Sequence, residues 1–192
     1  MPPKAKFRRE EVIDAAFEIV RRDGMEALTA RSLAAELQSS PRPIFTVFQS
    51  MEEVQAEIMK KGRRLYESYE DREMEGENAF KGSGTGYIRF AQEEPKLFQL
   101  FFMREMQEIP NPEKVLQTID GYYEKIVSAV ERQYGFDQKT AERVYLHMWL
   151  YSHGIAVAIA TKVCTFTGEQ ISTMLTEVCS SIIQKIKREQ SV

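Results

Sequence analysis

Apolar side chains recur every three to four residues through almost the whole chain, and this spacing constrains the fold more than any other feature. A period of this length places apolar residues on one face of an α-helix, whereas alternation in twos indicates a strand. No alternating run is present, and Gly and Pro stand mostly where helices begin or end. The sequence therefore predicts an all-α protein.

The N-terminal part contains a closely spaced group of helices. We expect them over residues 8–23, 29–38, 40–48 and 50–74. Thr29, Ser40 and Ser50 are suitable N-caps, and Glu53 is expected to reach back to the Ser50 amide in a capping box. Two short helices around a three-residue turn, braced by a longer preceding helix, form the arrangement that docks a helix in the DNA major groove.

The remainder of the chain is also expected to be helical. Residues 75–86 are polar and rich in glycine, beginning with Gly76, and we expect a flexible connection there. A helix broken at Pro95 follows. Three further helices are expected over residues 112–134, 138–163 and 168–188.

Charge is distributed unevenly along the chain. Residues 1–64 carry twelve Lys and Arg against ten Asp and Glu, while residues 65–192 carry fourteen against nineteen. A short basic arm opens the chain with Lys4, Lys6, Arg8 and Arg9. This pattern is compatible with DNA binding at the N-terminal end.

Several other classes of protein are not expected. The N-terminus is charged, and no apolar run reaches the roughly 18–20 residues of a membrane span, so we expect a soluble cytoplasmic protein with no membrane segment. Catalytic motifs are absent, and the acidic pairs at 52–53 and 93–94 are expected to be solvated, which predicts no enzyme and no cofactor. Cys164 and Cys179 match no zinc pattern and are expected to be buried, and His147 and His153 should lie on different helix faces, so no metal site is expected.

Three stretches of the N-terminal part, residues 12–16, 24–34 and 44–54, carry a recognisable pattern. Together they resemble the DNA-binding domain of the TetR/AcrR family of transcriptional regulators, and the resemblance covers about residues 8–62 without a gap. Residues 87–91 and 94–98, and Trp149 with His153-Gly154, resemble parts of the family's ligand-binding domain.

The resemblance implies an N-terminal three-helix domain (1–50), a long connecting helix (51–75) and a helical ligand-binding and dimerisation domain (76–192). It implies that the third helix reads an operator in double-stranded DNA, that Thr29 and Ser40 touch phosphates, and that the last two helices pair in a homodimer. The outward face of the third helix, the basic arm and the resemblance together give the candidate DNA-binding residues Lys6, Arg8, Thr29, Arg31, Ser39, Ser40, Arg42, Pro43, Phe45, Thr46 and Gln49.

This sequence departs from the family pattern at three positions. Phe45 stands where many relatives have Tyr, Met51 where many have Lys, and Pro43 where a small polar residue is common. Neither Phe45 nor Met51 can bind a phosphate as Tyr and Lys do. An alternative therefore remains open, namely a helical small-molecule or protein-binding module that has lost specific DNA binding.

The C-terminal part is rich in Phe, Met and Tyr at helical spacing, which suits either plain core or an apolar ligand cavity with a few polar anchors. For a small-molecule effector we expect contacts from Phe90, Phe98, Phe102, Tyr123, Trp149 and His153. The expected pairing stripes of the last two helices include Val144, Met148 and Ile155 on one and Ile171, Leu175 and Ile186 on the other. We expect the protein to be a repressor that effector binding releases from DNA. The effector would change the distance between the two DNA-binding domains of the dimer.

Overall fold

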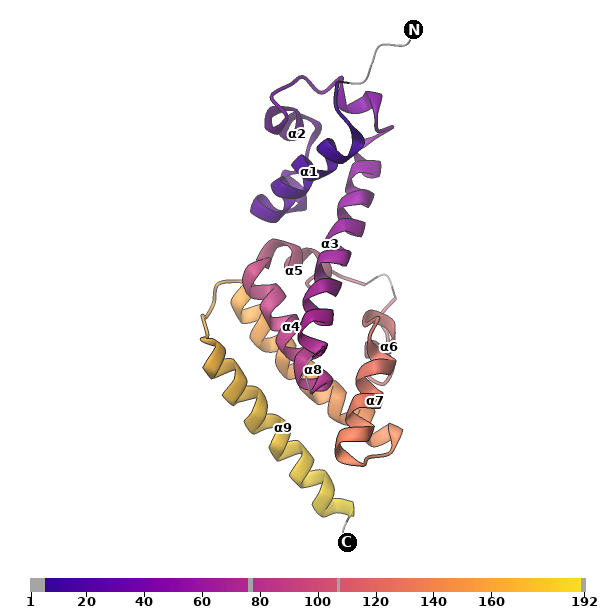
Figure 1. The fold of residues 1–192 in the computed structure, drawn as a ribbon, viewed down its shortest axis with the longest axis vertical. Helices are drawn as coiled ribbons and strands as arrows, with labels where there is room; N and C mark the ends of the chain where they lie inside the picture. Colours follow the sequence, from indigo (N-terminus) through magenta and orange to yellow (C-terminus); the bar gives the residue numbers. More distant parts are fainter. Residues whose placement is uncertain (1–5, 76–77, 107, 191–192) are drawn as a thin grey trace. The chain divides into compact units, whose positions relative to one another are not determined.

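A computed structural model describes residues 6–75, 78–106 and 108–190 (Figure 1). Every regular element within these ranges is helical, which confirms the all-α prediction. The elements are α1 (Arg9–Asp23), η1 (Met25–Ala27), α2 (Ala30–Glu36), η2 (Ile44–Thr46), α3 (Met51–Met74), α4 (Ala79–Glu93), α5 (Pro95–Phe102), α6 (Val115–Ile119), α7 (Tyr123–Tyr134), α8 (Gln138–Ala160) and α9 (Gly168–Gln190), where η denotes a 3₁₀ turn. Lys4 and Gly76 lie outside the described residues.

The chain divides into two compact units. The N-terminal unit comprises residues up to 68 together with 94–104, and the C-terminal unit comprises residues 69–93 and those from 105 onward. These units differ from the expected ranges 1–50, 51–75 and 76–192, because α3 contributes to both units and α5 belongs to the N-terminal one.

Two contacts explain why α5 joins the N-terminal unit. The ring of Phe101 in α5 rests on α3 at Gly62, where a Cβ atom would come within 2.9 Å of the ring. Arg21 of α1 binds both carboxylate oxygens of Glu94, the residue before α5, with 2.8 Å between Nε and Oε2. Glu94 is therefore only 5% exposed, and the expectation that residues 93–94 are both solvated was wrong for Glu94.

The expected Thr29 cap is confirmed, and two further helix starts carry side-chain caps of the same kind, whereas Ser40 caps no α-helix. The Ser32 amide donates to Thr29 Oγ1 at the start of α2, and the Thr140 amide donates to Asp137 at the start of α8. Thr167 and Gln170 form the reciprocal bonds of a capping box before α9. Such side-chain acceptors satisfy amides that have no partner within the helix, which is why these boundaries were predictable.

The third helix of the N-terminal unit is shorter than expected. Residues 40–48 were predicted to be α-helical, but the only helical segment there is the three-residue 3₁₀ turn η2. Pro43 accounts for part of the difference, because its ring disfavours the α conformation at Arg42, the residue before it. The Ile44 and Thr46 amides bond instead to the carbonyls three residues earlier, those of Pro41 and Pro43.

The expected flexible connection over residues 75–86 was wrong, because most of it forms the first half of α4. Its glycines have a packing role: a Cβ atom at Gly82 would lie 2.1 Å from the carbonyl oxygen of Glu73, and one at Gly86 would lie 2.8 Å from that of Tyr69. The absence of these side chains lets α4 approach the backbone of α3 closely. Close approach offsets the low helix propensity of glycine.

The single helix expected over residues 112–134 is divided into α6 and α7 at Asp120. The backbone of Asp120 is extended, with φ −114° and ψ 113°. Its carboxylate accepts hydrogen bonds from the Tyr122 amide, at 2.7 Å, and from the Tyr145 hydroxyl. A side chain that binds the backbone two residues later favours a turn over a continuing helix.

Candidate nucleic-acid interface and C-terminal polar cluster

The outward face of η2 presents side chains that could contact a ligand. Arg42, Phe45, Thr46 and Gln49 are exposed, while Ile44 and Phe48 between them are 0% and 2% exposed. The two buried residues anchor the turn in the core of the N-terminal unit. They thereby fix the direction in which the exposed side chains project.

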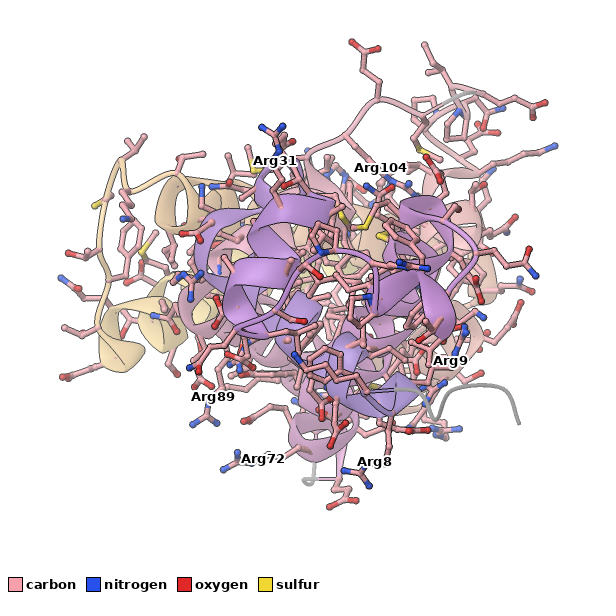
Figure 2. All side chains as sticks on the ribbon, turned by 90° about the horizontal axis from the view of Figure 1, so that it is seen from above. Arg8, Arg9, Arg31, Arg72, Arg89 and Arg104 are labelled. Carbon is pink, nitrogen blue, oxygen red and sulfur yellow. The ribbon has the colours of Figure 1, made fainter. Side chains whose placement is uncertain are left out.

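The other predicted DNA-binding residues lie in the arm before α1, at the start of α2 and in the segment between α2 and η2. Lys6, Arg8, Thr29, Arg31 and Ser40 are exposed, and Ser39 and Pro43 are partly exposed. Figure 2 shows Arg31 and Arg8 extending beyond the ribbon of the unit. The structure therefore leaves the predicted set accessible, although its role in binding DNA stays a prediction.

Two basic residues of the N-terminal arm have defined partners. Lys6 Nζ donates to Ser39 Oγ at 2.9 Å, which ties the arm to the turn after α2. The Arg8 guanidinium lies 3.1 Å from Glu11, but its side chain remains 77% exposed. An ion pair this exposed contributes little, so Arg8 can exchange Glu11 for a phosphate at small cost.

Arg9 has a structural role that the sequence did not reveal. Its guanidinium lies over the Phe48 ring, 4.1 Å from the centroid, and donates to the Val47 carbonyl at 3.1 Å. The same group pairs with Glu53 at 2.7 Å and Glu57 at 3.3 Å. Arg9 thus joins α1, the end of the turn and α3. The only sequence signal was the pair of acids four residues apart on α3.

The predicted capping box at the start of α3 was wrong in one detail. Glu53 Oε2 accepts the amide of Gln49, at 2.6 Å, rather than that of Ser50. This bond and the bond from Arg9 hold the pKa of Glu53 below its usual value. Glu53 therefore fixes the end of the exposed segment at Gln49.

Pro43 and Thr46 stabilise the turn itself. Pro43 has the φ of −60° that its ring imposes, and the Thr46 hydroxyl donates to the Pro43 carbonyl at 2.6 Å. The proline that departs from the family pattern therefore shapes η2. The two other departures differ in exposure, since Phe45 is 43% exposed whereas Met51 at the start of α3 is partly buried.

The six predicted effector-binding residues fall in different parts of the fold. Phe98 and Phe102 lie in the N-terminal unit, where their ring centroids are 5.2 Å apart. Phe90, Tyr123, Trp149 and His153 lie in the C-terminal unit. Phe90 is completely buried, while Trp149 and His153 are partly exposed.

Within the C-terminal unit, a polar cluster joins α3, α4 and α8. The Tyr87 hydroxyl lies 2.8 Å from His153 Nδ1, and the His153 ring stacks on Trp149 at 5.1 Å between centroids. Burial, reinforced by the negative charges of Glu70 and Asp120, raises the pKa of Tyr87 far above its usual range, and burial lowers the pKa of His153. At neutral pH the hydrogen bond therefore joins two uncharged groups.

Glu70 of α3 is only 1% exposed, and its burial was not predicted because nothing in its sequence context indicates it.

A second set of polar contacts surrounds Tyr123. Its hydroxyl donates to Glu142 at 2.7 Å and accepts from Gln117 at 3.1 Å. The Tyr123 and Tyr145 rings are 6.3 Å apart, and Tyr145 in turn binds Asp120. Burial raises the pKa of Asp120, a change that the Tyr122 amide partly opposes. Tyr123 thus has hydrogen-bond partners in α6 and α8.

The C-terminal unit also has a solvent-open cleft of about 700 Å³ between the end of α3, α4 and the start of α9. Its walls include Lys81, Arg89 and Ser172, but none of the six predicted effector-binding residues. Arg89 is held by Glu73 at 2.6 Å and Glu93 at 3.0 Å.

The described residues contain no group of three or more His, Cys, Asp or Glu that could hold a metal ion. The expectation of two buried cysteines was wrong for Cys164, which is exposed, while Cys179 is partly buried. None of the described helices has the length and apolar character needed to cross a membrane.

Part of the expected pairing surface is buried within the unit, since the six stripe residues named from the sequence are at most 7% exposed. Met174, Val178 and Ile182 on α9 are partly exposed. The outer face of α8 instead carries Arg143, His147, Leu150 and Gly154 at helical spacing. Leu150 is 52% exposed, and no atom lies within 4 Å of a Cβ built on Gly154.

No protein-family model matches the chain. The chain is similar to a protein of Bacillus subtilis (strain 168) named "Uncharacterized HTH-type transcriptional regulator YobS", with 23% identity over 107 residues. The alignment covers 54% of this chain and 56% of the relative, so the chain spans about half the length of the curated protein it matches. The comparison thus identifies a distant similarity to an HTH-type transcriptional regulator.

Proposed function

We propose that this protein is a DNA-binding transcriptional regulator of the TetR/AcrR type. The observation that carries the proposal is the exposed face formed by Arg42, Phe45, Thr46 and Gln49 on a turn anchored by buried residues. A rigid segment with cationic and hydrogen-bonding side chains is suited to the major groove, where phosphates position a protein and base edges specify the site. The name of the distant relative supports the same role.

The ion pairs of the N-terminal unit separate its basic residues into those that stabilise the fold and those that are available to DNA. Arg9 has acidic partners within the fold, so it positions the turn. Arg31 and Arg42 are exposed, and together with Lys6 and Arg8 they would supply the phosphate contacts. These cations replace the contacts that Phe45 and Met51 cannot make.

We propose that the protein binds DNA as a homodimer, which suits an operator with two half-sites. Two DNA-binding domains related by a two-fold axis can contact two half-sites that lie about one helical turn of DNA, roughly 34 Å, apart. Leu150 and Gly154 give α8 an outward apolar patch on which a second copy can pack closely. Partly exposed Met174, Val178 and Ile182 on α9 supply further apolar surface for the pairing.

We propose the C-terminal unit as the sensor, with no enzymatic activity of its own. The partly exposed rings of Trp149 and His153 could stack on a small amphipathic molecule, and the buried Tyr87 hydroxyl holds the His153 ring in place. Binding there would favour a conformation in which the distance between the two DNA-binding domains does not fit the operator, and the protein would act as a repressor released by its effector.

The decisive experiment measures binding of the purified protein to a labelled duplex from the intergenic DNA upstream of its own gene, with a random duplex for comparison. We expect specific binding that weakens as salt rises and is lost in Arg42→Ala with Thr46→Ala. Lys139→Ala, which removes an exposed cation of α8, is the matched control and should bind normally.

If the duplex from upstream is not bound, duplexes selected from a randomised library provide the next test. Equal and weak binding to every duplex would contradict the proposal. That result would favour the alternative, a helical binding module without specific DNA recognition.

A further inference from the structure

Phe45 is the unusual residue of the proposed DNA-binding face. Its side chain is 43% exposed, although the adjacent Ile44 is completely buried and Phe48 is almost so. Since those two residues anchor the turn, the outward direction of Phe45 is imposed by the fold. Covering a large exposed apolar group with another apolar surface lowers the free energy, because it removes that group from water.

The surroundings of Phe45 indicate what that surface is. Arg42, Thr46 and Gln49 share its outward face, and Arg31 is exposed on α2 of the same unit. An apolar protein partner would have to cover these polar and cationic groups as well. Double-stranded DNA matches both properties, because its phosphates attract cations and its base edges include apolar groups.

One group in the major groove matches an aromatic side chain. The edges of the base pairs present hydrogen-bond donors and acceptors, and thymine alone adds a C5 methyl group. A phenylalanine ring forms no hydrogen bond with a phosphate or with the polar base edges. Contact with the methyl removes apolar surface of both partners from water.

We propose that Phe45 is a specificity-determining residue that recognises thymine through its C5 methyl group. This inference rests on the proposed DNA binding and adds that each half-site contains a thymine facing Phe45. Burial of one methyl group corresponds to about a fourfold change in affinity. The residue that lacks the hydroxyl for a phosphate contact therefore reads a base.

The test uses duplexes selected by the full-length protein from a randomised library. Each thymine of the selected site is replaced in turn by deoxyuridine, which removes only the methyl group. We expect deoxyuridine at one position, repeated symmetrically in both half-sites, to weaken binding about fourfold per half-site. Replacement of the other thymines should have less effect.

Protein variants separate this contact from the rest of the interface. Phe45→Ala should bind the thymine site more weakly and lose its sensitivity to deoxyuridine, while Phe45→Leu should retain part of it. Arg31→Ala is the control, since loss of a phosphate contact should weaken binding to both duplexes by the same factor. Thermal unfolding checks that each variant is folded.

The outcomes distinguish the two levels of the proposal. Thymine recognition would be overturned if deoxyuridine left the affinity of specific binding unchanged at every position. It would also be overturned if deoxyuridine weakened binding of Phe45→Ala as much as that of the wild type. Either result would leave the proposed DNA binding intact. Absence of any selected duplex would instead refute the proposed function, and thymine recognition with it.

Discussion

Charged side chains of the N-terminal unit occur in two settings, a largely buried ion pair and exposed cations. Glu94 is almost fully buried and holds Arg21 through two hydrogen bonds, and this contact raises the pKa of Arg21. Arg8 and Arg31, by contrast, extend into solvent (Figure 2). The Arg21–Glu94 pair joins α1 to the residue before α5, while the exposed cations remain available for a partner.

Replacement of Glu94 by glutamine tests the buried pair. Arg21 would lose its buried counter-charge and keep the exposed Glu18, and its side chain is 38% exposed, so water would compensate in part. We expect Glu94→Gln to reduce the free energy of unfolding by about 1–3 kcal/mol, measured by urea denaturation. Glu18→Gln, at the 59% exposed partner of the same arginine, should change it by less than about 0.5 kcal/mol. Similar values for the two variants would contradict a structural role for Glu94.

His153 predicts a pH dependence of stability. Burial lowers its pKa in the folded protein below the ordinary value of 6.5. The unfolded chain therefore binds a proton more readily, so the stability present above pH 6.5 is lost as the pH falls toward the lowered folded value. Thermal unfolding between pH 8 and pH 5 should show a smaller loss in His153→Gln than in the wild type. The exposed His147 provides the control, and an equal flattening in His147→Gln would contradict the assignment.

At the scale of helices, backbone proximity determines the position of α4. Gly82 and Gly86 face the backbone of α3, whose carbonyl oxygens occupy the space that side chains would need. Gly82→Ala should destabilise the C-terminal unit by about 3 kcal/mol, because a backbone has to shift. Gly168→Ala, at the open start of α9, should change the free energy of unfolding by less than about 0.5 kcal/mol. Denaturant unfolding of both variants checks this expectation, and a Gly82→Ala protein of wild-type stability would refute the close approach.

In the short η2 element, the sequence pattern predicts which residues are exposed but not the type of helix. Its apolar spacing is that of a helix, with Ile44 and Phe48 directed inward, so the exposed face follows from the pattern whether the turn is α or 3₁₀. The hydrogen bonds of this segment are of the 3₁₀ kind, yet the residues that project outward are those that the helical pattern predicts. The candidate face was therefore predictable although the element type was not.

For the whole molecule, the proposed regulation requires two copies of the chain. Leu150→Glu places a charge on the outward patch of α8 and should yield a monomer in sedimentation equilibrium, with greatly weakened binding to operator DNA. Thr173→Glu, at an exposed position of α9, should leave both properties unchanged. A Leu150→Glu protein that remains dimeric would show that another surface pairs the subunits.

The sequence by itself determined the helical class, most helix boundaries and the exposed set around Arg42, because periodicity and caps depend on neighbours within a few residues. It did not determine the burial of Glu94, the bracing role of Arg9 or the helical state of the glycine segment. Those depend on partners far along the chain: Arg21 for Glu94, Glu53 and Glu57 for Arg9, and the α3 backbone for Gly82. Only the tertiary structure brings such groups together, because contact energies and excluded volume act through space rather than along the sequence.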